Sequence, residues 1–182
     1  MDSNGGRENG TGSGSHRLLN QEELTAVFRR LGARDPEGWA RSQIVEGINQ
    51  LARFLFLRQA WGLVVDESDA GWIERHIKRA EAKPREPYAG VGLALKALRA
   101  RGAEGDEILD LVRGVQAELL FNLCYLLDEG GDLEAEAFGV EWGLVEIDQE
   151  GRPREHIGGL HESVLDTDPT GREMRTRKSV GP

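Results

Sequence analysis

The first stretch of hydrophobic residues has helical spacing. Asn20 stands where a helix N-cap is needed, Glu23 follows three positions later, and Gly32 comes directly after the last apolar position. The apolar residues between them fall at i, i+3, i+4 and i+7: Leu24, Val27, Phe28 and Leu31. The pattern therefore predicts an amphipathic helix between Asn20 and Gly32.

Two later segments are apolar on nearly every side. One opens at Asp35-Pro36, with the proline in the first helical position, and runs to about Val64, becoming apolar throughout from Leu51 onward. The other spans about 106–128. Because an all-round apolar helix is typically a buried one, we expect these two helices to form the central pair of the fold. Two shorter helices are expected at 71–81 and 88–101.

The C-terminal third changes from helical to alternating periodicity. Apolar and charged residues alternate from Val145 to Asp148, and 149–153 has the composition of a turn. A return strand at 154–157 would complete a hairpin, with a β-bulge near Gly143 to keep the alternation in phase. A last short helix is expected at 160–165.

These elements predict a mainly α protein: a bundle of about five helices with a small C-terminal β-hairpin at about 140–158. The length of 182 residues fits one domain. We expect a disordered polar tail at 1–17, a single helical domain at 18–171 and a flexible basic tail at 172–182.

The chain carries no signal of membrane insertion or secretion. Its most apolar stretch is shorter than the roughly 20 residues that a bilayer requires. Cys124 is the single cysteine, so no internal disulfide can form, and a reducing, cytoplasmic location is expected. Within its apolar segment we interpret Cys124 as a small buried hydrophobe. Arginine outnumbers lysine 19 to 4, a coding bias that hints at a GC-rich bacterial genome.

Charge is segregated along the chain. From Glu104 to Glu150 there are fourteen acidic residues and one basic residue, Arg113, whereas Arg17 to Arg101 carries a net charge of +4. An acidic surface repels nucleic acid and attracts a basic protein partner. We therefore expect a non-enzymatic binding module, of an immunity or antitoxin-like or adaptor kind, with no cofactor and no nucleic-acid or membrane partner. The expected contact residues are Glu129, Asp132, Glu134, Glu136 and Glu141.

The histidines support an alternative hypothesis. A metal-dependent hydrolase or lyase built on a helical bundle would draw its ligands from His76, His156 and His161, although their spacing matches no recognised zinc pattern. A third hypothesis is a structural subunit of a larger assembly, in which the wide apolar faces of the two helices are partly shared between protomers. The sequence does not determine the oligomeric state.

One short segment resembles a known signature. Asp166-Thr167-Asp168-Pro169-Thr170 has the outline of the Asp-x-Asp-x-Thr motif of haloacid-dehalogenase-like enzymes, a resemblance that implies a nucleophilic Asp166 at the start of an α/β domain. Only fourteen residues follow Asp168, which leaves no room for that sheet. We therefore interpret the segment as a turn.

Four polar residues interrupt the two apolar helices, where an unpaired charge would be costly. They are Arg53 and Arg58 in the first helix and Glu118 and Asn122 in the second. If the helices are antiparallel neighbours, the pattern predicts an Arg–Glu pair between them that sets their register.

Overall fold

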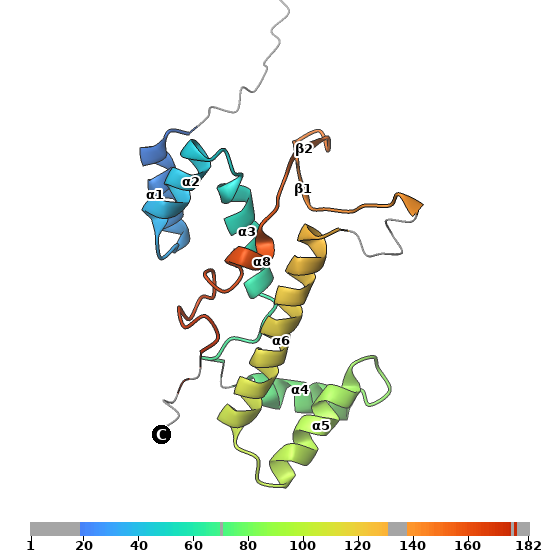
Figure 1. Ribbon diagram of the computed structural model, residues 1–182. Helices are drawn as coiled ribbons and strands as arrows, with labels where there is room; N and C mark the ends of the chain where they lie inside the picture. The colour runs from blue at the N-terminus through green and yellow to red at the C-terminus, as the bar shows by residue number, and fades with distance from the viewer. Residues whose placement is uncertain (1–18, 70, 131–137, 176, 178–182) are drawn as a thin grey trace, which may run out of the picture.

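The computed structural model describes residues 19–69, 71–130, 138–175 and 177 (Figure 1). It confirms a mainly helical protein with a small antiparallel hairpin near the C-terminus, with seven helices in the described residues where about five were expected. The helices are α1 (Gln21–Leu31), α2 (Pro36–Val45), α3 (Gln50–Trp61), α4 (Trp72–Ala82), α5 (Ala89–Ala100), α6 (Gly105–Asp128) and α8 (Leu160–Ser163). The strands are β1 (Val145–Ile147) and β2 (Pro153–His156).

The start and end of α1 follow the local sequence signals. The Asn20 side chain accepts a hydrogen bond from the Glu23 amide while the Glu23 carboxylate accepts one from the Asn20 amide, forming a capping box. Gly32 ends the helix in a left-handed conformation, at φ 87°. Both ends of the predicted first helix are therefore confirmed.

The predicted second helix is in fact two helices, α2 and α3. The chain breaks between them at Gly47, which has a positive φ of 72°. Asn49 then caps α3 by accepting a hydrogen bond from the Ala52 amide. The continuous-helix prediction was wrong here because a glycine and a capping asparagine interrupt a segment whose composition is otherwise helical.

The buried hydrophobic side chains form three separate clusters. One joins α1 and α2 to α3 around Phe28, which stacks on Trp39 and meets Phe54 edge-on. A second joins α4, α5 and the start of α6 through Ile73, Leu95 and Ile108. The third joins α3, α6 and α8, with these buried members: Leu57, Ala60, Trp61, Val64, Ala117, Leu120, Cys124, Ile157, Leu160 and Val164.

The 24-residue helix α6 links two of these clusters (Figure 1). Its first turns pack on α4 and α5, and its second half packs on α3 and α8. The expected contact between the two apolar helices is confirmed for α3 and α6, but the expectation of all-round burial was wrong. Leu119 is 67% exposed while its neighbour Leu120 is 8% exposed.

The hairpin pairs β1 with β2 in antiparallel register, with Val145 opposite His156 and Ile147 opposite Pro153. An irregularity between Val145 and Ile147 occupies the region where a bulge was expected, two residues beyond Gly143. Most residues of both strands are exposed, so the hairpin is a surface element. None of the described helices combines the length and the apolar character needed to cross a membrane.

Candidate functional site

The chain after α6 is held against the C-terminal end of that helix. The Trp142 indole Nε1 donates a hydrogen bond of 2.8 Å to the carbonyl of Leu126, and the Trp142 amide donates one of 3.4 Å to the carbonyl of Gly130. A Cβ on Gly130 would collide with the Trp142 carbonyl oxygen. Only glycine therefore permits this crossing, which brings Trp142 beside the helix end.

This crossing produces a surface that is both acidic and apolar. Glu129 precedes Gly130 and Glu141 precedes Trp142, so each of the two exposed glutamates is the chain neighbour of a residue in this backbone contact. Phe138, three residues before Glu141 in the chain, is 82% exposed. We refer to Glu129, Phe138, Val140, Glu141 and Trp142 as the acidic end surface. The other expected contact residues, Asp132, Glu134 and Glu136, lie outside the described residues.

A second exposed apolar feature runs along α6. Successive members lie four, four, four and three positions apart, which keeps them on one side of a helix with 3.6 residues per turn. They are 47 to 67% exposed. We refer to these residues as the outer face of α6: Leu111, Val115, Leu119, Leu123 and Leu126.

The charge beside the outer face is negative. Glu107 and Glu118 lie on one flank of the apolar stripe, and both are exposed. No ion pair to either is present in the part of the chain that the structure describes. The single basic residue of α6, Arg113, is buried on the opposite side of the helix. The outer face therefore combines hydrophobic and acidic groups without an exposed cation from its own helix.

Arg113 forms a buried ion pair with Asp168. The Arg113 Nη2 and the Asp168 Oδ1 are 2.8 Å apart, and the two side chains are 3% and 0% exposed. Arg113 also donates to the carbonyl of Val65 and lies over the ring of Trp61, whose indole donates to the carbonyl of Val164. The pair fastens the segment after α8 to the inner side of α6.

Asp168 is a structural residue in this arrangement. Besides Arg113, it accepts hydrogen bonds from the backbone and hydroxyl of Thr170 and from the Met174 amide. Burial acts to raise the pKa of Asp168, but the bonds from Thr170 and Met174 and the charge of Arg113 outweigh it, and the net pKa is lowered. The interpretation of this segment as a turn agrees with the hydrogen bond from the Gly171 amide to the Asp168 carbonyl.

The sequence predicts a buried ion pair, but between other residues than Arg113 and Asp168. The predicted Arg–Glu pair between the apolar helices is absent among the described residues, since Arg58 and Glu118 are exposed. Arg53 is buried and donates weakly to the Ser163 hydroxyl, at 3.4 Å. The informative residue was Arg113, because a lone cation in an otherwise apolar or acidic helix requires a buried carboxylate partner.

Asp128, at the end of α6, organises α8. Its Oδ2 accepts a hydrogen bond from the His161 amide at 2.8 Å and lies 2.6 Å from His161 Nδ1. It thereby serves as a cap for α8, whose own N-cap residue, Gly159, has no side chain to do so. Burial lowers the pKa of nearby Arg53, and the charges of Glu162 and Asp128 offset part of this effect. Asp128 thereby holds α8 against the C-terminal end of α6.

The three histidines considered as metal ligands lie on different elements. His76 is on α4 with its ring 4.9 Å from that of Trp72, His156 is at the end of β2, and His161 is on α8. Within residues 19–69, 71–130, 138–175 and 177, no three histidine, cysteine or acidic side chains are arranged to hold a metal ion. Cys124 is buried as expected, and burial together with the charge of Asp128 raises its pKa to about 11.

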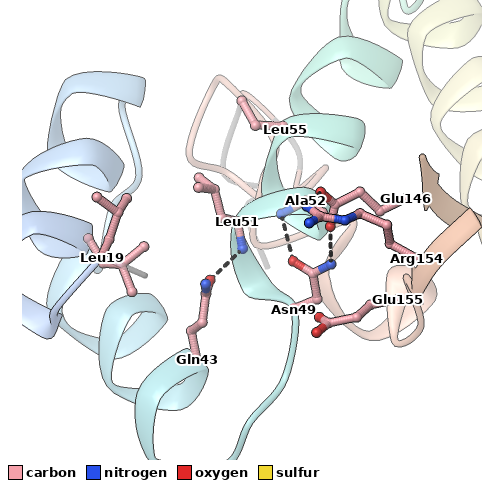
Figure 2. Close-up of a pocket in the computed structure, with 10 residues that line it drawn as sticks. Leu19, Gln43, Asn49, Leu51, Ala52, Leu55, Glu146, Arg154 and Glu155 are labelled. Atoms are coloured by element: carbon pink, nitrogen blue, oxygen red, sulfur yellow. Dashed lines mark hydrogen bonds and ion pairs between the residues drawn. The ribbon is translucent and has the colours of Figure 1, made fainter. Parts of the chain in front are cut away.

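A cleft of about 510 Å³ lies between α1, α3 and the hairpin (Figure 2). Leu19, Leu51 and Leu55 give it apolar walls. Two hydrogen bonds join groups that line it: the Asn49 Nδ2 donates to Glu146 at 3.0 Å, and the Gln43 side chain accepts from the Leu51 amide at 2.8 Å. The Asn49–Glu146 bond therefore connects the hairpin to the start of α3 at this cleft.

No protein-family model, curated protein or solved structure matches this chain. The functional argument consequently depends on the surface chemistry of the described residues.

Proposed function

We propose that the protein is a non-enzymatic cytoplasmic binding module, a neutraliser of the immunity or antitoxin kind or an adaptor, whose acidic end surface binds a basic protein partner. The observation that carries this proposal is that Glu129 and Glu141 are exposed in the same two short segments as the exposed aromatic side chains of Phe138 and Trp142, with Trp142 bonded to the end of α6. Solvated acidic loops do not ordinarily gather exposed aromatic side chains.

The two kinds of side chain have different roles in association. Carboxylates accelerate the encounter with a basic partner and select against acidic ones, which makes binding depend on ionic strength. Aromatic side chains supply the contact area that provides most of the affinity at protein interfaces. The hydrogen bonds of Trp142 hold its ring at the helix end before any partner arrives, which reduces the entropy lost on binding.

Charge reversal tests this proposal. The wild-type chain and the variant Glu129→Lys/Glu141→Lys are used as baits in the source cell, and retained proteins are identified at two salt concentrations. We expect a basic protein that the wild type retains at low salt and releases at high salt, and that the variant does not retain. Direct titration of that purified protein then gives both dissociation constants.

A matched control separates the site from net charge. Glu46→Lys/Glu86→Lys changes the charge by the same amount on exposed residues of other segments. We expect it to bind like the wild type. Equal loss of binding in both variants, or binding that neither variant nor salt changes, would refute the proposed site.

A further inference from the structure

The outer face of α6 is an apolar stripe left uncovered by the described chain. Its five members, Leu111 to Leu126, are about half exposed or more. With a rise of 1.5 Å per residue, the stripe extends for about 22 Å along the helix axis. The opposite side of the same helix supplies the buried contacts of Arg113, Ala117, Leu120 and Cys124, so the stripe is in excess of what the fold requires.

We propose that this outer face docks an amphipathic helix of the partner that carries lysine or arginine along one flank. This inference rests on the proposed function and specifies the kind of partner. A straight row of side chains at i+3 and i+4 spacing is the surface that the apolar stripe of a second helix fits, by ridges-into-grooves packing. A partner helix of about 15 residues would cover the whole stripe.

The charges specify the basic flank. Glu107 and Glu118 border the stripe, and α6 presents no exposed cation beside them. A partner helix with lysine or arginine on the adjacent flank therefore meets opposite charges along the contact. The exposed Asn122 interrupts the stripe with a polar amide, and such a group favours one register over shifted ones.

The same charges argue against a second copy of this chain as the occupant. In an antiparallel two-fold pair of α6 helices, the flank that carries Glu107 and Glu118 would lie against the same acidic flank of the second copy, and like charges across an interface oppose association. A partner helix with an apolar stripe and a positively charged flank matches both the apolar and the charged part of the surface.

Designed peptides test the proposal on the full chain. One 18-residue helix carries a leucine stripe at i, i+3, i+4 and i+7 with lysine flanks, a second has glutamate flanks, and a third has the lysine composition in scrambled order. We expect calorimetry to show binding of the lysine helix alone, weakening as salt is added. The variant Val115→Gln/Leu119→Gln should bind it at least about tenfold more weakly, because two apolar contacts are lost.

Leu63→Gln is the matched control, because Leu63 is 83% exposed outside α6. It should bind the lysine helix like the wild type, and circular dichroism should show that all variants remain folded. The inference is overturned if wild-type chain does not bind the lysine helix, if the scrambled peptide binds equally well, or if Leu63→Gln weakens binding as much as Val115→Gln/Leu119→Gln. Light scattering supplies a further test. If the wild-type chain is a dimer and Leu119→Gln dissociates it, the inference is also overturned, because the occupant of the outer face is then a second copy of this chain.

The natural partner separates this inference from the proposed function. If Glu129→Lys/Glu141→Lys abolishes its binding while Val115→Gln/Leu119→Gln has no effect, the acidic end surface is retained and the outer-face inference fails. If instead Val115→Gln/Leu119→Gln abolishes its binding while Glu129→Lys/Glu141→Lys has no effect, the proposed role of the acidic end surface fails and the outer-face inference is retained.

Discussion

The two sides of α6 have similar hydrophobic content and opposite structural roles. The inner side buries Ala117, Leu120 and Cys124 against α3 and α8, and it neutralises Arg113 with Asp168. The outer face has leucines and valine at the same helical spacing, yet they remain exposed beside Glu107 and Glu118, which have no ion-pair partner among the described residues. The comparison shows that hydrophobic content alone does not determine burial. The inner side stabilises the fold, whereas the outer face is exposed in the described part of the chain and is the proposed binding surface.

The largest effect is expected from breaking the buried ion pair. Arg113→Met leaves the buried Asp168 carboxylate without its ion-pair partner, and such losses cost about 3 to 5 kcal/mol of unfolding free energy. Chemical denaturation measures this change. Arg113→Met/Asp168→Asn should recover part of the loss because the amide carries no charge, and a single-variant loss under about 1 kcal/mol would show that the pair does not join the C-terminal segment to α6.

Adjacent leucines give a sharper comparison of the two sides. Leu120→Ala removes a buried side chain and should lower the unfolding free energy by about 2 to 4 kcal/mol. Leu119→Ala removes an exposed one and should change it by less than about 0.5 kcal/mol. Thermal and chemical denaturation of the two variants measure the difference. Equal losses would mean that the outer face is packed in the free protein.

Acid should weaken the inner side of α6 through Asp168. Its pKa is lower in the folded protein than in the unfolded chain, so the unfolded state binds the proton more readily. The resulting stability is present above the unfolded pKa of about 3.9 and is lost as the pH falls through the folded pKa. Asp168→Asn should reduce the slope of unfolding free energy against pH in this range. An unchanged slope would exclude Asp168 as a source of acid sensitivity.

Thiol reactivity distinguishes the two sides without destabilising the fold. Cys124 is buried and its pKa is raised to about 11, so very little thiolate is present at pH 8. It should react with Ellman's reagent much more slowly than free cysteine. A cysteine placed by Leu123→Cys, in a Cys124→Ser background, should react at nearly the rate of free cysteine. Comparable rates at the two positions would contradict the assigned faces.

Local signals in the sequence predict most of the helical elements. The Asn20 and Gly32 caps act within a few residues, so they can be recognised without knowledge of the fold. The break at Gly47 was missed because the surrounding composition remains helical, and a single glycine does not always end a helix. Which glycine takes a positive φ depends on how α2 and α3 pack.

Partners between distant residues could not be assigned from the sequence. Arg113 and Asp168 are 55 positions apart, and their contact depends on how the chain folds back after α8. The outer face of α6 was missed for a related reason: a leucine stripe predicts a covered helix face, but only the tertiary arrangement shows whether this chain covers it. Glu129 and Glu141 could be identified as charged residues, whereas the contact between their chain neighbours, Gly130 and Trp142, depends on the tertiary structure.

The division of α6 into a structural and a binding side is tested most directly by methyl NMR of the leucine-labelled full chain during titration with the lysine-flanked helix. The account predicts that methyl resonances of Leu111, Leu119, Leu123 and Leu126 shift as the peptide saturates, while those of Leu109 and Leu120 remain in place. Shifts confined to other parts of the chain, or equal shifts on both sides of α6, would contradict it.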